Sequence, residues 1–222
     1  MIPTGLPNLT PVRTVVANAS RLGSGLLAVH SVVVTGTRLV PESEVVAAAD
    51  IQSGTPLVRV NTTRIAERVL TIKQILSVRV STSWPDRVVI AVQERTSALA
   101  VALPGGGFDL IDAHGIIVQP DAVQHLGLPL YTTTAGVSAL PGDPAVAAAA
   151  AVLGELPASL RSSVTSVTAP SPDQVTLRLT SGVTIVWGSP DNAAAKAREL
   201  AILMRTQAHY YDVSSPGSAV TS

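Results

Sequence analysis

The sequence of 222 residues contains no cysteine, which excludes disulfide bonds and thiolate chemistry. Charge is also sparse, because only 14% of the residues are charged and fifteen basic residues balance fifteen acidic ones. No basic surface for nucleic acid is therefore indicated. Hydrophobic residues make up 46% of the chain, which predicts a folded protein with one large or two small domains.

Residue patterns of catalytic and metal sites are missing as well. Residues 105–107 are three glycines, but no helical pattern with Lys-Ser or Lys-Thr follows them, so they do not form a phosphate loop. The serines lack a G-x-S-x-G elbow. His30, His125 and His209 lie far apart, without carboxylates at ligand spacing, which argues against zinc. We expect no enzyme activity and no cofactor.

Asp112 and His114 allow two interpretations. They could be metal ligands, or an acid and a base that act with a serine in a small hydrolase. A D-x-x-G sequence at a hairpin, however, needs only the Asp side chain to cap the turn. We favour the turn.

Residues 29–95 give the clearest structural signals. A β-branched run over 29–35 predicts a strand that ends at Gly36. Two helices are expected next, the first with Pro41 at its first helical position and the second with Asn61 as N-cap. On the second helix, Arg64, Glu67 and Arg68 are expected to face water.

A hairpin completes this stretch. Leu76, Val78 and Val80 alternate with polar residues, as in a half-buried strand, and their expected partners are Val88, Ile90 and Val92. Residues 83–86, Ser-Trp-Pro-Asp, have the composition of the turn between them. The predicted order is strand, helix, helix, strand, strand.

The rest of the chain indicates a second, β-rich domain that begins near Ser97. Residues 119–143 are expected to form a loop with one short strand around Leu130 and Tyr131. In a closing helix that begins near Pro190, Lys196, Arg198 and Glu199 are expected to face solvent. Strands are predicted over 98–103, 108–111, 116–118, 164–168, 174–179, 183–186 and 209–213, and a further helix over 144–156.

Three features could serve a partner. Trp84 at the hairpin tip is either tucked under its sheet or offered to another protein, whereas Trp187, inside a strand pattern, is expected to fill a core. The strand over 209–213 is the last one predicted, and a last strand is commonly an edge that another chain can extend. The alternative for the following tail is a loose chain end.

Short motifs follow one another along the chain. The first domain contains VTG at 34–36, GTPL at 54–57, WPD at 84–86 and Glu94-Arg95, and the second contains FDLIDAHG at 108–115, VTIVWG at 183–188 and YDVSSP at 211–216. In their order and spacing, the first set resembles the POTRA domain of the FtsQ/DivIB family of bacterial cell-division proteins, and the second set resembles the β-rich domain of actinobacterial members. The expected fold class is α+β, with a flexible lead over 1–26, a POTRA domain over 27–97 and a β-domain over 98–222.

The resemblance implies a non-catalytic, membrane-anchored scaffold at the division septum, with most of the chain outside the cytoplasm. Its partners would be FtsB/DivIC-type and FtsL-type proteins and other division components, and it would link early division proteins to septal peptidoglycan synthesis. The alternative is a POTRA-type chaperone or docking module of a secretion or outer-membrane assembly system. The resemblance implies a strand around Ser218 to Val220 that receives the partner and is reached from residues 210–213. The implied partner-binding residues are Tyr210, Tyr211, Asp212, Val213, Ser218, Ala219 and Val220, with a second contact at Trp84.

The family's membrane helix is not visible ahead of the expected POTRA domain. A membrane-spanning helix needs about 20 consecutive apolar residues. Residues 12–34 are instead interrupted by Arg13, Asn18, Arg21, His30 and Ser31. We therefore expect that the anchor lies upstream, in a longer form of the protein.

Overall fold

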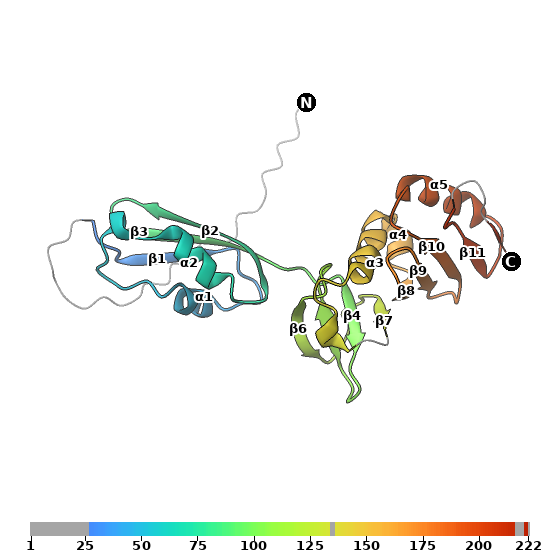
Figure 1. Cartoon of the computed structure of the whole chain (residues 1–222), viewed down its shortest axis with the longest axis horizontal. Helices are drawn as coiled ribbons and strands as arrows, with labels where there is room; N and C mark the ends of the chain where they lie inside the picture. The colour runs from blue at the N-terminus through green and yellow to red at the C-terminus, as the bar shows by residue number, and fades with distance from the viewer. Residues whose placement is uncertain (1–26, 134–135, 216–219, 222) are drawn as a thin grey trace, which may run out of the picture. The chain divides into compact units, whose positions relative to one another are not determined.

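A computed structural model describes residues 27–133, 136–215 and 220–221 (Figure 1). The chain divides into two compact units between Arg95 and Thr96. The first unit contains two α-helices and three strands, and the second contains the remaining nine strands that the structure describes. The predicted α+β class is thereby confirmed.

The first unit has the predicted order of elements, with one short 3-10 helix added. Its sheet has the order β1-β3-β2, in which β3 pairs parallel with β1 and antiparallel with β2. The elements are β1 (Ser31–Thr35), α1 (Glu42–Ala49), η1 (Leu57–Arg59), α2 (Thr62–Val69), β2 (Ile75–Ser83) and β3 (Arg87–Glu94).

The hairpin register confirms the predicted alternation from Val78 onward, but Leu76 is exposed, because the register shifts between Ile75 and Ser77. Val78 lies opposite Val92 and Val80 opposite Ile90, whereas Val88 lies opposite Thr82. Both helices pack on the same core as these strands, through Val45 and Ala49 of α1 and Ile65 and Val69 of α2. The apolar positions of the two strands therefore lie on the face that the helices cover.

The helix starts follow the expected chemistry with one difference. The Asn61 side chain accepts the backbone N–H of Arg64 at 2.9 Å, which confirms it as the N-cap of α2. Pro41 is itself the N-cap of α1, with extended backbone angles, so the first helical residue is Glu42 and not Pro41.

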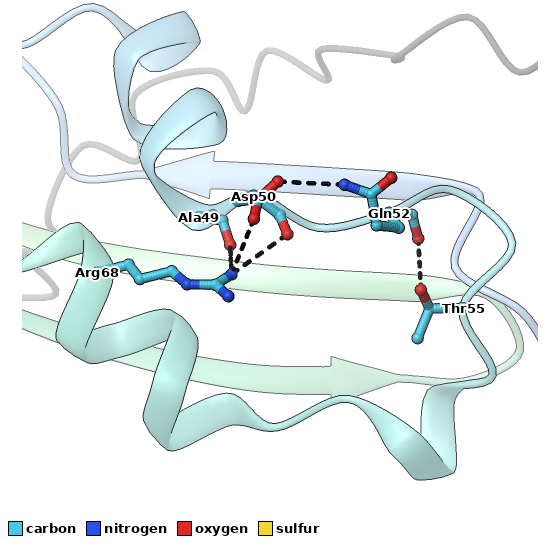
Figure 2. Close-up of polar contacts among 5 residues, drawn as sticks. All are labelled: Ala49, Asp50, Gln52, Thr55 and Arg68. Atoms are coloured by element: carbon cyan, nitrogen blue, oxygen red, sulfur yellow. Dashed lines mark hydrogen bonds and ion pairs between the residues drawn. The ribbon is translucent and has the colours of Figure 1, made fainter.

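The helical pattern predicted that Arg68 faces water, but Arg68 also contacts the end of α1. Its Nη1 atom donates hydrogen bonds to the carbonyl oxygens of Ala49 (3.1 Å) and Asp50 (3.3 Å) and lies 3.5 Å from the Asp50 carboxylate (Figure 2). These carbonyls belong to the end of α1, where Asp50 has a φ of 47°. Arg68 therefore ties α2 to the last turn of α1.

The Glu94 carboxylate joins the end of β3 to the loop before α1. Its Oε1 atom accepts backbone N–H groups of Arg38 (2.8 Å), Leu39 (3.0 Å) and Val40 (2.9 Å). Burial raises the pKa of Glu94, but these three hydrogen bonds and the charge of Arg38 outweigh it, and the pKa lies below its ordinary value.

The second unit is built on one mixed sheet. Its strand order is β12-β11-β10-β9-β8-β7-β4-β5-β6, and β7 pairs parallel with both β4 and β8. The elements are β4 (Leu99–Ala102), β5 (Phe108–Ile111), β6 (Ile117–Ala122), β7 (Leu130–Thr132), η2 (Val137–Ala139), α3 (Pro144–Glu155), α4 (Ala158–Arg161), β8 (Val164–Thr168), β9 (Val175–Leu179), β10 (Thr184–Gly188), α5 (Ala193–Leu203), β11 (Tyr210–Asp212) and β12 (Val220–Thr221).

The helices α3 and α5 contribute to the main core of this unit, which also contains Trp187 and Tyr211. The helix α3 begins at the N-cap Asp143, whose side chain accepts the backbone N–H of Ala145 at 2.8 Å. Burial, and then the charge of Asp143, raise the pKa of Tyr131, whose hydroxyl donates to the carbonyl oxygen of Ala169.

Two expectations about the strands of this unit were wrong. Residues 119–122 belong to β6 rather than to a loop, although the strand contains Pro120. A proline is tolerated there because β6 is at the edge of the sheet. The strand over 209–213 is also not the last one, because β12 follows it.

Candidate partner-binding edge

The strand β11 takes its place through parallel pairing with β10, in which Tyr210 lies opposite Thr184. The helix α5 lies between these two strands in the sequence and makes the crossover that a parallel pair requires. Tyr211 and Val213 are buried in the core, whereas Tyr210 and Asp212 are half-buried. Alternate side chains therefore attach β11 to the domain.

The outer side of β11 is occupied by the chain itself. Val220 and Thr221 form β12, which runs antiparallel to β11 and pairs Thr221 with Tyr211 and Val220 with Asp212. Ser218 and Ala219, the other two residues expected in a receiving strand, lie outside the described residues. Among the described strands, β12 is the outermost at this end of the sheet, so this edge lies at β12 and not at β11.

Thr221 was not among the residues that the sequence suggested. The β-branched pair Val220-Thr221 is the signal that could have identified it, but a run of two residues is too short for a periodicity to show.

The two edges of this sheet differ. At one end, β6 contains Pro120, which has no N–H, and Asp121, which has a φ of 49°. The backbone N–H of Asp121 donates to the buried carboxylate of Asp109 at 3.1 Å. At the other end, neither residue of β12 is a proline. The β6 edge is thus poorly suited to accept another strand, whereas β12 retains its backbone groups.

Lys196 is buried and does not face solvent, contrary to the helical pattern. It is 1% exposed, and its amine donates to the carbonyl oxygens of Trp187 (3.0 Å) and Ser189 (2.9 Å). Burial lowers the pKa of Lys196, and the nearby charge of Asp191 counteracts this in part. The pattern failed because a long side chain can reach polar atoms from a position on the core face of a helix.

The two tryptophans have opposite environments. Trp187 is fully buried in the core of the second unit, as predicted. Trp84 is 64% exposed at the tip of the β2–β3 hairpin, so it is not tucked under its sheet. An exposed tryptophan is a candidate contact for a partner.

Asp112 caps a turn, as we favoured. Its Oδ1 atom accepts the backbone N–H groups of His114 (2.8 Å) and Ile116 (2.9 Å), while His114 Nδ1 lies 3.5 Å from Oδ2. His30 and His125 each contact a backbone carbonyl of a nearby residue. Over the described ranges, no group of three or more His, Asp or Glu side chains is placed to bind a metal ion.

No helix in the part of the chain that the structure describes combines the length and the apolar character needed to cross a bilayer.

The first unit has the elements of a POTRA domain, and residues 27–95 match the family model of the FtsQ-type POTRA domain. The chain is therefore a POTRA protein with a second, β-rich domain. Residues 100–215 of that domain match the model described as cell division protein FtsQ/DivIB, C-terminal. The chain belongs to the FtsQ/DivIB family, as the resemblance predicted.

Curated relatives are named cell division protein FtsQ. The protein of Mycobacterium leprae is 34% identical over 216 residues, which cover 91% of this chain and 60% of that protein. The protein of Mycolicibacterium smegmatis is 35% identical, with 86% and 56% covered. The protein of Streptomyces griseus is 35% identical, with 90% and 99% covered. The chain thus spans less than two thirds of the mycobacterial proteins and almost all of the Streptomyces protein.

Proposed function

We propose that this protein is a non-catalytic scaffold of the division machinery that binds its partner by adding a strand to β12. The partners would be FtsB/DivIC-type and FtsL-type proteins, and binding would link early division proteins to septal peptidoglycan synthesis. The proposal places the two domains outside the cytoplasm at the septum, tethered by an upstream membrane helix as the family resemblance implies. A secretion-type POTRA function has no comparable support, because the family is FtsQ/DivIB.

The observation that best supports the proposal is the position of β12 at the end of a nine-stranded sheet. An edge strand has backbone groups on one side that no neighbour in the sheet uses, and a peptide can bind them. Because the β6 edge contains Pro120, the β12 edge is the better acceptor. Tyr210, Tyr211, Asp212 and Val213 would support this edge rather than contact the partner backbone directly.

The pairing of β12 makes a sharp test available. In an antiparallel ladder, hydrogen-bonded and non-hydrogen-bonded pairs alternate. The pairs Tyr211–Thr221 and Asp212–Val220 are adjacent, so one of the two β12 residues directs its backbone groups toward β11 and the other directs them away. Only the residue whose backbone groups are directed away from β11 can offer its N–H to an added strand.

The experiment measures the affinity of the full chain, and of its Val220→Pro and Thr221→Pro variants, for a purified FtsB/DivIC-type coiled-coil segment from the same cell. One of the two prolines should weaken binding by about tenfold or more while amide exchange in β11 stays unchanged. Thr221→Val, which retains the backbone N–H and the β-branched shape, is the matched control. If neither proline affects binding, the docking edge lies elsewhere.

Trp84 would then serve a different contact, on the POTRA domain. We infer that its exposed ring at the hairpin tip binds a recruiting division protein. In the same assay, Trp84→Ala should leave the affinity for the coiled-coil segment unchanged, because the residue lies in the other unit.

A further inference from the structure

Gly188, the last residue of β10, makes an unusually close backbone contact with the segment that follows β11. Its φ is +76°, and a Cβ atom at this position would lie 2.9 Å from the Cβ atom and 3.1 Å from the Cα atom of Ser214. Any side chain at position 188 would therefore clash with Ser214, and one of the two residues would have to shift. Ser214 lies where the chain leaves β11, six residues before β12 begins.

The backbone on both sides of Gly188 is held in place. The amine of Lys196 binds the carbonyl oxygens of Trp187 and Ser189, which directly flank Gly188. Trp187 is fully buried, and the pairing of β10 with β9 changes register between Val186 and Gly188. If a Cβ atom were added at position 188, Ser214 would thus have to move and the backbone of Gly188 would not.

Two hydrogen bonds set the direction of the chain at Ser214. The backbone N–H of Val213 donates to the carbonyl oxygen of Val186 at 2.9 Å, which continues the β10–β11 pairing by one residue. The backbone N–H of Ser214 donates to Oδ1 of Asp212 at 2.9 Å, which turns the chain. Both bonds act immediately beside the Gly188 contact.

We propose that Gly188 and Ser214 are positioning residues for β12: their close contact sets the direction in which the chain leaves β11, and β12 pairs with the outer side of that strand. The effect on a partner rests on the proposed function, because β12 is the strand to which the partner would add. The effect on the β11–β12 pairing does not depend on any partner.

The first readout is hydrogen exchange at the backbone amides of Val220 and Thr221 in the full chain without a partner. Gly188→Ala should increase exchange at these amides and at the outer side of β11 by about tenfold, because crowding opens the strand pair. Gly182→Ala is the matched control, because Gly182 has a φ of +85° in the same domain with no atom within 4 Å of the added Cβ. It should change exchange at β12 by less than about threefold.

A rescue separates positioning from general damage. Ser214→Gly removes the atom nearest to the added Cβ and leaves the Cα atom of residue 214 at 3.1 Å, so the double variant Gly188→Ala, Ser214→Gly should exchange more slowly at Val220 and Thr221 than Gly188→Ala does. If Gly188→Ala does not fold, Ser214→Gly is tested by itself and should still raise exchange at Val220 and Thr221. The proposal is wrong if exchange there is unchanged, if it rises equally in β8 and β9, or if the double variant shows no rescue.

The second readout is the affinity for the purified FtsB/DivIC-type segment, which should fall in proportion to the fraction of molecules in which β12 is closed. If the amides of Val220 and Thr221 lose their protection completely in Gly188→Ala but the affinity stays the same, Gly188 positions β12 and the docking edge is misplaced. If the affinity falls without a change in exchange at β12, the positioning role is wrong and the docking edge remains.

Discussion

Replacement of Glu94 by glutamine should destabilise the POTRA domain more than its surface position suggests. One carboxylate oxygen of Glu94 accepts three consecutive backbone N–H groups, at 2.8 to 3.0 Å, from a loop 54 to 56 residues away in the sequence. Glutamine keeps one acceptor oxygen but removes the negative charge that strengthens these bonds.

The expected magnitude follows from the hydrogen bonds and from their partial exposure. A hydrogen bond to a charged group contributes about 1.5 to 3 kcal/mol when it is shielded, and exposure reduces this contribution. We expect a loss of about 1 to 1.5 kcal/mol for Glu94→Gln, and of about 2 to 3 kcal/mol for Glu94→Ala, which also removes the acceptor. Glu67→Gln removes the same charge from an exposed position on α2 and should cost less than about 0.5 kcal/mol.

The assay is native-state amide exchange at Val88, Ile90 and Val92 in the full chain, because these buried residues of the central strand report on the POTRA domain alone. A loss of 1.4 kcal/mol corresponds to about tenfold faster exchange once intrinsic rates are corrected. A Glu94→Gln variant that exchanges as slowly as Glu67→Gln would refute the role of the carboxylate.

The same variant has a defined pH dependence. The pKa of Glu94 in the folded protein lies below its ordinary value of 4.5, so the unfolded chain binds the proton more readily. The stabilisation is therefore present above pH 4.5 and is lost as the pH falls through the lower folded pKa. The difference between wild type and Glu94→Gln should shrink over this range, and a difference that persists there would contradict the assignment.

Two further substitutions test other contacts. Gly36→Ala would place a Cβ atom 1.9 Å from the carbonyl oxygen of Val92 and should lower the stability of the POTRA domain by more than about 3 kcal/mol. Gly54→Ala, whose added Cβ atom has no other atom within 4 Å, should lower it by about 1 to 2 kcal/mol. Amide exchange in β3 measures both changes. Lys196→Met should destabilise the β-domain by about 2 to 3 kcal/mol, measured by exchange in β9, because two carbonyl oxygens lose their donor; an unchanged stability would show that water replaces the amine.

The parts of the fold that the sequence predicted are those in which side-chain chemistry acts locally. The β2–β3 hairpin follows from an alternating pattern, and the start of α2 follows from the cap that Asn61 provides. The turn at Asp112 was predicted from a D-x-x-G sequence, and the two backbone donors that the Asp112 side chain accepts lie within four residues of it.

The parts that were missed depend on contacts between distant segments. Arg68 and Lys196 are charged residues that were expected to face solvent, and only the tertiary structure brings carbonyl groups within their reach. The strand character of residues 119–122 comes from pairing with β5, because this segment has no periodic pattern of its own. Residues 220–221 pair with β11 and also lack such a pattern, and only the family resemblance implied a strand close to them. The position of the β12 edge, which determines the candidate partner-binding site, could therefore be predicted only in part from the sequence.

The unequal ends of the nine-stranded sheet limit the assemblies that it can form. A polymer of copies joined head to tail would need each β12 to pair with the β6 of the next molecule, and Pro120 together with the bend at Asp121 disfavours that junction. Head-to-tail joining of copies through this sheet is therefore disfavoured. Each molecule would hold a single partner segment, or two molecules would close on each other as a symmetric pair, and open-ended fibres would be avoided.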